Sequence, residues 1–182
     1  MDWKATTIDV GDGARLRAWR ADDLGALLRH ANDEQVSRGL STRFPFPYTH
    51  ADGETFLSGH VVDLAQPVFA IEIEGEACGS IGAHPGQGER RYGAALGYWL
   101  GRRHWGQGRM TCIVGVFAPW VMQALSLYRL QATVLEFNTG SARVLLKNGF
   151  IDEGTQHCAV VKHGKLHDLR TFAMTRTMRD AD

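Results

Sequence analysis

The chain has 182 residues, a length typical of one compact domain, and 44% of its residues are hydrophobic, enough to bury an ordinary core. Lysine plus arginine and aspartate plus glutamate each number 20, so the formal net charge is zero. Such a balance provides no overall field for attracting nucleic acid or a membrane surface. We therefore expect neither partner, and any anion-binding site has to be local.

The N-terminal residues, the longest apolar run and the cysteines indicate the cellular compartment in which we expect the protein. The chain opens with mixed charge rather than a basic segment followed by an apolar stretch, so we expect no secretory signal or transit peptide and a cytoplasmic protein. The longest apolar run, residues 110–122, is shorter than the about 18–20 residues that span a bilayer, and we interpret it as a core helix. Cys78, Cys112 and Cys158 are widely spaced, which favours reduced, buried thiols.

In the first half of the chain, short alternating patterns predict strands and leucine spacing predicts a helix. Turn sequences containing glycine separate the strands, and prolines keep the preceding residues out of helical conformation. The expected elements are a hairpin of residues 6–10 and 15–20, a helix beginning after residues 21–23, an extended aromatic and proline-rich loop at 41–49, and a helix near 52–64.

The second half predicts more strands and two helices. Apolar residues at i, i+3, i+4 and i+7 predict a helix over residues 106–125, which Pro119 should bend or interrupt at a cost of about 3 kcal/mol. The other expected elements are strands at 68–74, 77–83, 92–100, 130–137, 150–161 and 166–174, and a helix at 141–147 ended by Asn148-Gly149. Antiparallel hairpins with one later helical crossover indicate a single α+β domain.

A glycine-rich segment, residues 103–109, lies between the strand ending at Leu100 and the long apolar helix. Such a turn exposes unpaired backbone N–H groups at a helix N-terminus, where the helix dipole also favours negative charge. The segment therefore predicts a phosphate-binding loop.

Two common phosphate-binding motifs do not fit this segment. A P-loop would place lysine and serine or threonine where Gln107 and Gly108 stand, so we do not expect ATP or GTP. A dinucleotide-binding loop would need a further glycine where Thr111 stands and an acidic residue about twenty positions later, so we do not expect NAD.

Several motifs in this order resemble the GNAT acetyltransferase superfamily, in particular its RimJ/RimL branch. They are Arg103-x-x-Gly106-x-Gly108, residues 96–100 (LGYWL), Asn138-x-x-Ser141-x-Arg143-Val144-Leu145, residues 147–150 (KNGF), Leu16-Arg17 and residues 46–49 (FPYT). The resemblance covers nearly the whole chain. It implies one GNAT domain over residues 1–182, with a mostly antiparallel twisted sheet that is splayed at the coenzyme A site and flanked by helices.

The resemblance also implies acetyl-coenzyme A as co-substrate. It assigns the pyrophosphate to the glycine-rich loop. Because His104 lies within this loop, we expect its backbone N–H to matter more than its ring. Glycine inside a strand often marks a close backbone approach, and Gly97 is expected to leave room for the pantetheine arm. The implied cofactor-binding residues are Trp99, Gly101, Arg103, His104, Trp105, Gly106, Gln107, Gly108, Arg109, Met110, Asn138 and Lys147.

The pattern departs from the family at two catalytic positions. Leu145 stands where many relatives carry a tyrosine acid, and Ala95 stands where relatives often carry a glutamate base. Ser141 is our candidate general acid, with a first-turn serine that bonds only to backbone as the alternative. Glu136 is the candidate base, with a solvated surface carboxylate and a fixed water as alternatives.

For the amine acceptor, the aromatic loop offers Tyr48 as a pocket wall and Arg43 as a partner for a carboxylate, and an ordinary packed loop is the alternative for both. The predicted activity is transfer of an acetyl group to a primary amine, in particular a protein N-terminal α-amine of the ribosomal-protein type. A small-molecule amine or antibiotic is the alternative acceptor, and a non-catalytic coenzyme A sensor is the alternative class.

Eight histidines lack the spacing of metal ligands, so the sequence predicts no metal. A monomer and a homodimer are both compatible with the sequence.

Overall fold

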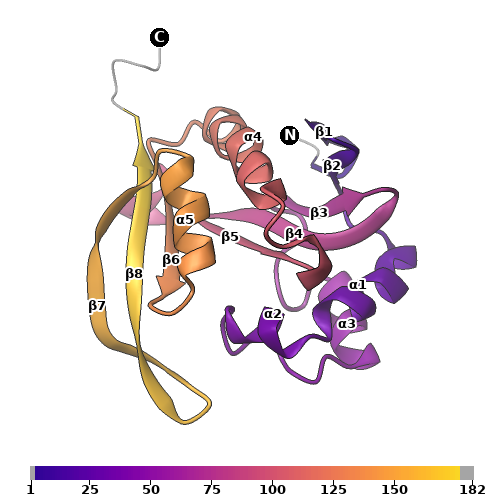
Figure 1. Ribbon diagram of the computed structural model, residues 1–182. Helices are drawn as coiled ribbons and strands as arrows, with labels where there is room; N and C mark the ends of the chain where they lie inside the picture. The colour runs from indigo at the N-terminus through magenta and orange to yellow at the C-terminus, as the bar shows by residue number, and fades with distance from the viewer. Residues whose placement is uncertain (1–2, 177–182) are drawn as a thin grey trace. The chain divides into compact units, whose positions relative to one another are not determined.

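The computed structural model describes residues 3–176 and contains eight strands and five α-helices in those residues (Figure 1). The strands are β1 (Thr7–Gly11), β2 (Ala14–Arg17), β3 (Val68–Ile73), β4 (Glu76–Pro85), β5 (Gly93–Leu100), β6 (Arg129–Leu135), β7 (Ile151–Lys162) and β8 (Lys165–Thr175). The helices are α1 (Leu24–Ala31), α2 (Glu34–Arg38), α3 (His50–Leu57), α4 (Arg109–Ala124) and α5 (Thr139–Lys147).

The strands form one mixed sheet in the order β1-β2-β3-β4-β5-β6-β8-β7. The pairs β1–β2, β2–β3, β3–β4, β6–β8 and β7–β8 are antiparallel, and β5–β6 is parallel. The expected α+β class and mostly antiparallel sheet are therefore confirmed, whereas the splay at a cofactor site stays a prediction. No helix within residues 3–176 is long and apolar enough to cross a membrane.

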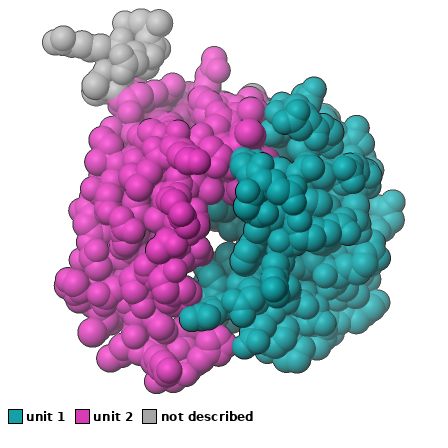
Figure 2. Space-filling model, in the orientation of Figure 1, with its two compact units in different colours: residues 1–82, 97–109 teal, residues 83–96, 110–182 magenta. Residues whose placement is uncertain are grey.

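The chain divides into two compact units (Figure 2). Unit 1 comprises residues 1–82 and 97–109, and unit 2 comprises residues 83–96 and 110–182. Unit 1 contains a buried cluster of Leu27, Ala31, Val36, Tyr48, Phe56 and Trp99. In unit 2 the buried residues of α4 all lie on one face of the helix, as the periodicity predicts: Ile113, Val114, Phe117, Ala118, Val121 and Met122.

Helix α3 is shorter than the predicted helix at residues 52–64, because glycine ends it early. Thr49 caps its start, with the Asp52 N–H donating to Thr49 Oγ1 at 3.3 Å. Gly59 follows the end with a φ of 82°, its N–H donates to the Phe56 carbonyl, and the His60 N–H donates to the Thr55 carbonyl. This pair of bonds around a left-handed glycine is the Schellman motif, which terminates helices.

Two further expectations need correction. Helix α2 lies in a segment for which no element was expected, and Asp33 caps it by accepting hydrogen bonds from the Gln35 and Val36 N–H groups. Helix α4 continues through Pro119 without interruption. The carbonyl that loses its helical partner to this proline belongs to Gly115, an exposed residue, so water can satisfy it.

The cysteines also differ from expectation. Cys78 is buried, but Cys112 and Cys158 are exposed. Cys112 lies on the solvent side of α4, next to the buried Ile113. Cys158 lies where the register of the β7–β8 pair shifts, in a strand that is almost wholly exposed.

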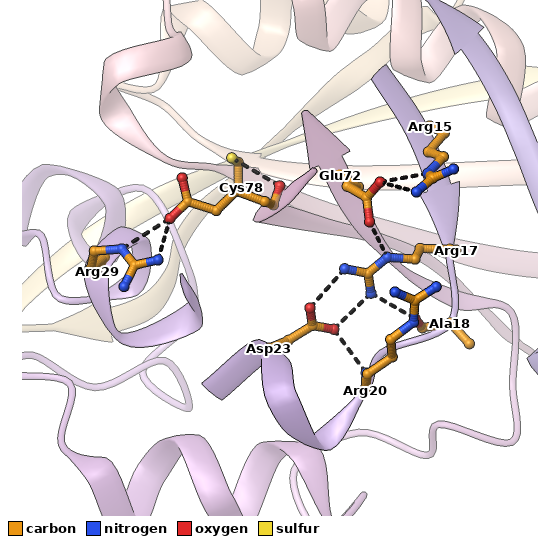
Figure 3. A network of polar contacts seen from close by, with 9 residues as sticks. Arg15, Arg17, Ala18, Arg20, Asp23, Arg29, Glu72 and Cys78 are labelled. Carbon is orange, nitrogen blue, oxygen red and sulfur yellow. Dashed lines mark hydrogen bonds and ion pairs between the residues drawn. The ribbon is translucent and has the colours of Figure 1, made fainter. Parts of the chain in front are cut away.

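A buried ionic network links β2, β3 and the turn before α1 (Figure 3). Arg17 binds the Asp23 carboxylate through both terminal nitrogens at 2.7 Å, and its Nε donates to Glu72. All three side chains are buried. The hydrogen bonds that Arg17 donates to Asp23 and Glu72 outweigh the cost of burial and raise the pKa of Arg17. Burial alone would raise the pKa of Glu72, but Arg17 and Arg15 more than offset it and lower that pKa.

We expect Arg17→Ala to lower the free energy of unfolding by about 3–5 kcal/mol at pH 7, because it removes the buried guanidinium that pairs with the Asp23 and Glu72 carboxylates. Arg15→Ala is the matched control. Arg15 also binds Glu72, but its side chain is 52% exposed, so the loss should stay within about 1 kcal/mol. Urea unfolding of both variants measures the difference. Equal losses of unfolding free energy would show that the burial of Arg17 does not decide how much its ion pairs stabilise the fold.

Candidate functional site

The glycine-rich loop follows the end of β5 and is hydrogen-bonded to β4. The Gly101 N–H donates to the Cys78 carbonyl at 2.7 Å. A Cβ atom at residue 101 would lie only 2.3 Å from His30 Nδ1 and 3.1 Å from the Cys78 carbonyl oxygen, so this close approach requires glycine. A short 3-10 turn, Arg102–His104, follows and directs the chain toward the start of α4.

The backbone hydrogen bonds of the loop join residues within the loop and leave three N–H groups without a partner among the described residues. The His104 N–H donates to the Gly101 carbonyl and the Trp105 N–H to the Arg102 carbonyl, both at 3.0 Å, so the backbone N–H of His104 is engaged within the loop. In the part of the chain that the structure describes, the N–H groups of Gly106, Gln107 and Gly108 have no hydrogen-bond partner. The positive φ angles of Gly106 (74°) and Gly108 (76°) produce this turn.

Side chains brace the loop without covering these donors. The Trp105 indole donates to the Leu100 carbonyl at 2.7 Å, and the Gln107 amide donates to the Arg103 carbonyl at 2.9 Å. Arg109 Nε donates to Gln107 Oε1 at 3.0 Å. Among the described residues, Arg109 Nη1 is buried and has no hydrogen-bond partner. Backbone N–H groups next to an unpaired guanidinium nitrogen are the donor set that binds phosphate oxygens.

Arg103, the arginine of the predicted motif, is held by Glu76 at the start of β4. Its guanidinium forms an ion pair with the Glu76 carboxylate, and its Nε donates to His104 Nε2 at 3.0 Å. Arg29 binds the same carboxylate at 2.5 Å. The hydrogen bonds from Arg29 and Arg103 lower the pKa of Glu76 to about 2. A phosphate that binds Arg103 must therefore compete with a carboxylate that stays ionised.

The predicted acceptor residues lie in different surroundings. Tyr48 is only 6% exposed and belongs to the buried cluster with Trp99, and its burial raises its pKa to about 12. The Phe44 ring bridges them, with centroids 5.1 Å from Tyr48 and 5.3 Å from Trp99. Arg43 is exposed. The burial of Tyr48 and Trp99 indicates packing roles, and contact of Tyr48 or Arg43 with an acceptor stays a prediction.

Asn138 and Ser141 lie together at the start of α5 in unit 2. Asn138 Oδ1 accepts a hydrogen bond from the Ser141 N–H at 3.2 Å, so Asn138 is the N-cap of the helix and Ser141 lies in its first turn. Leu145 is fully buried, and Lys147 is exposed at the last position of the helix. The helix cap is therefore established, and catalysis by Ser141 stays a prediction.

Asn148, which the sequence indicated only as part of a helix end, also joins α5 to α4. Its side-chain nitrogen donates to the Val144 carbonyl at 2.9 Å and to the Thr111 carbonyl at 3.1 Å. A Cβ at Gly115 would lie 2.8 Å from Asn148 Oδ1, so the small residue permits this approach. The expected left-handed glycine after Asn148 is confirmed, since Gly149 has a φ of 79°.

Glu136, the candidate base, is paired with a residue that the sequence did not single out. Its Oε1 lies 2.7 Å from Nδ1 of His167 on β8. This hydrogen bond lowers the pKa of Glu136. A lower pKa makes the carboxylate a weaker base. The pairing was not visible in the sequence because it joins the residue after β6 to a residue of β8 that is distant along the chain.

The predicted site residues therefore fall into two groups. Unit 1 contains Arg43, Tyr48, Trp99, Gly101, Arg103, His104, Trp105, Gly106, Gln107, Gly108 and Arg109, and unit 2 contains Met110, Glu136, Asn138, Ser141 and Lys147. Within unit 1, residues 106–108 present three consecutive backbone N–H groups that have no hydrogen-bond partner among the described residues.

Comparison with known proteins adds independent findings. A family model described as an acetyltransferase (GNAT) domain matches residues 14–151. Two Bacillus subtilis proteins are similar: "Probable N-acetyltransferase YjcK", 37% identical over 44% of this chain, and "Uncharacterized N-acetyltransferase YoaA", 31% identical over 56% of it. In these alignments the chain spans about half of each relative, 45% and 56%.

One solved structure with the same fold is RimL, a ribosomal L7/L12 α-N-protein acetyltransferase in complex with coenzyme A. It superimposes with a TM-score of 0.82 at 21% identity and covers 97% of this chain and all of its own. At this identity the likeness concerns the fold alone.

We expect Glu76→Gln to lower the free energy of unfolding by about 1–2 kcal/mol at pH 7, because it removes the ion pairs with Arg29 and Arg103. The pKa of Glu76 is depressed in the folded state, so this contribution is complete above the ordinary pKa of 4.5. It should disappear as the pH falls toward about 2.

Urea unfolding at pH 7, 5 and 3 measures the trend. Glu74→Gln is the control, since exposed Glu74 makes no ion pair among the described residues. A difference between native protein and Glu76→Gln that does not change with pH would contradict the assigned cause.

Proposed function

This chain belongs to the acetyltransferase (GNAT) family, and from that premise we propose that it transfers an acetyl group from acetyl-coenzyme A directly to a primary amine. The observation that carries the proposal is the donor set of residues 106–109. Three backbone N–H groups and a buried guanidinium nitrogen, none of which has a hydrogen-bond partner among residues 3–176, suit the charge of a pyrophosphate.

We assign the pyrophosphate to Gly106, Gln107, Gly108 and Arg109, with Arg103 joining when it leaves Glu76. The family resemblance adds Trp99, Gly101, His104, Trp105, Met110, Asn138 and Lys147 as further cofactor-binding residues. We also propose that residues 1–182 form one GNAT domain. A cytoplasmic location, the absence of nucleic-acid and membrane partners, and a monomer or homodimer remain predictions from the sequence.

The reaction needs a neutral amine, since only its lone pair can attack the thioester carbonyl. A carbon–nitrogen bond forms, the carbon–sulfur bond breaks, the amine loses a proton to a base, and the sulfur of coenzyme A takes one up. In our proposal Ser141 provides the proton for the sulfur. Glu136 accepts the proton of the amine, directly or through a water.

We propose a protein N-terminal α-amine as the acceptor. The RimL structure with the same fold acts, by its description, on the α-amine of a ribosomal protein. An α-amine has a pKa of about 7.7–8.0, so a substantial neutral fraction exists near pH 7 and a weak base suffices. This demand fits a chain with a Glu136 of lowered pKa and with Ala95 in place of a glutamate.

Two alternatives make different predictions. A small-molecule amine or an antibiotic as acceptor would show as turnover with such compounds and none with peptides. A coenzyme A sensor, suggested by Ala95 and by the buried Leu145 at the usual acid position, would bind coenzyme A and turn over no amine. Thiol release from acetyl-coenzyme A, measured against N-terminal peptides, amino acids, polyamines and aminoglycosides, separates the three cases.

Gly106→Ala should weaken coenzyme A binding more than tenfold, because the positive φ of this residue is strained for alanine and the donor geometry changes. Gly88→Ala is the matched control. Gly88 also has a positive φ and open space around its Cβ position, but it lies outside the loop. Both variants should lose about 1 kcal/mol of stability, and only Gly106→Ala should lose binding in calorimetric titration. Equal binding by the two variants would remove the loop from the site.

Ser141→Ala should lower kcat by about 10²-fold while the affinity for coenzyme A stays unchanged, because the change removes a proton donor and leaves the Asn138 cap intact. Thr139→Ala, an exposed change in the same helical turn, should keep full turnover. A normal rate for Ser141→Ala would assign the serine to the helix alone.

A further inference from the structure

Three buried side chains outside the proposed anion donors converge in unit 1: His30 of α1, Cys78 of β4 and His104 of the short turn before the loop. They are 5%, 0% and 9% exposed. One ring nitrogen of each histidine and the Cys78 sulfur all lie within 4.8 Å of one another. The three residues are far apart in the sequence, which is why their spacing gave no sign of a common site.

The backbone holds this cluster in place. The Gly101 N–H binds the Cys78 carbonyl, and the missing Cβ of Gly101 admits the His30 ring. The centroids of the two imidazole rings are 5.8 Å apart. These contacts hold the backbone around the three side chains, whose ligand atoms lie within 4.8 Å of one another, so small side-chain movements bring them to metal-binding distances.

The cluster contains an unsatisfied polar atom. Among the described residues, His30 Nε2 is one of the few buried side-chain nitrogens without a hydrogen-bond partner, and the nearby Glu76 Oε1 is 3.6 Å away. Buried polar atoms in proteins are normally satisfied, so each exception calls for a physical explanation. A ligand that accepts the lone pair of an imidazole nitrogen would provide one.

The other two residues already face a cation. Arg103 Nε donates to His104 Nε2 at 3.0 Å, and Arg103 Nη2 lies 3.8 Å from the Cys78 sulfur. His104 Nε2 thus accepts a hydrogen bond from a cation, and the Cys78 sulfur, whose thiol donates to the Glu76 carbonyl at 3.2 Å, lies near the same guanidinium. A metal ion would bind a ring nitrogen of His104 and the Cys78 sulfur after the guanidinium has moved aside.

We propose that His30, Cys78 and His104 form a binding site for a divalent metal ion of the zinc type, held by two imidazole nitrogens and one thiolate. Zinc binds histidine nitrogen at about 2.0–2.1 Å and cysteine sulfur at about 2.3 Å, usually with four ligands in a tetrahedron. Water or the Glu76 carboxylate fills the fourth position. The proposal departs from the sequence analysis, which predicted no metal site.

The protonation states are compatible with such a site. Burial, and then the charge of Arg103, lowers the pKa of His30 and of His104, so both rings are neutral near pH 7. Burial raises the pKa of Cys78, so binding must displace the thiol proton. The exposed Cys112 and Cys158 belong to unit 2 and take no part.

The test uses the double variant Cys112→Ser/Cys158→Ser, in which Cys78 is the only thiol. After treatment with a chelator, the protein is titrated with Co²⁺ and followed by its sulfur-to-metal charge-transfer absorption. We expect saturation at one ion per chain, and Zn²⁺ should abolish the absorption by displacing Co²⁺. Because no other cysteine is present, this absorption reports Cys78 directly.

His30→Gln and His104→Gln should each weaken Co²⁺ binding more than about tenfold, since even residues outside the first coordination shell change metal affinity by about 10–100-fold. His60→Gln, an exposed change in the same unit, should leave the affinity unchanged. Absence of the charge-transfer absorption, or absorption that both cluster variants retain at full affinity, would overturn the proposal. Neither result depends on acetyl transfer, so failure here leaves the proposed activity untouched.

Discussion

The hydrogen bond from the Gly101 N–H to the Cys78 carbonyl joins the glycine-rich loop to the sheet. It lets the chain leave β5, turn at once over the start of β4 and expose the N–H groups of residues 106–108. The contact is possible only because residue 101 has no Cβ atom. The Arg103–Glu76 ion pair and the His30–Cys78–His104 cluster both form where this bond holds the loop against β4.

Charge is distributed unevenly around this contact although the whole chain is neutral. Glu76 forms ion pairs with Arg29 and Arg103, which keep its carboxylate ionised to low pH. The Arg17 network buries a second set of paired charges in the same unit. Arg109, by contrast, has a buried nitrogen that nothing in the described chain satisfies. The proposed binding of an anionic co-substrate therefore rests on unpaired donors in residues 106–109 and not on a basic surface.

Features encoded by neighbouring residues could be predicted from the sequence. The α+β class, the N-terminal hairpin, the one-sided apolar face of α4 and the Asn148-Gly149 helix end all follow from local spacing, and the glycine-rich loop is itself contiguous. Helix α3 ends earlier than predicted because Gly59 adopts a left-handed backbone conformation, which the sequence alone does not reveal. Helix α2 was missed because it is too short to show a helical periodicity. Cys112 is exposed because it lies on the face of α4 that does not pack in the core. The apolar residues around it in the sequence do not reveal this.

The site was predictable to the same extent. Gly106 and Gly108 were found because two glycines before an apolar helix have a direct physical consequence. The partners of the candidate residues could not be predicted. The Glu136–His167 pair and the Arg103–Glu76 pair join residues that are distant along the chain and are brought together only by the sheet. Asn138 is a case in which a family motif and a helix cap coincide at one residue, so the capping bond neither requires nor opposes a role with the cofactor.

The most direct measurement of the central claim is amide hydrogen exchange with and without coenzyme A, resolved to single residues by NMR. If the loop binds the pyrophosphate, exchange at Gly106, Gln107 and Gly108 slows on addition of coenzyme A, while the already bonded His104 amide changes little. Protection confined to other parts of the chain, with these three amides exchanging as before, would contradict a phosphate-binding role for the loop.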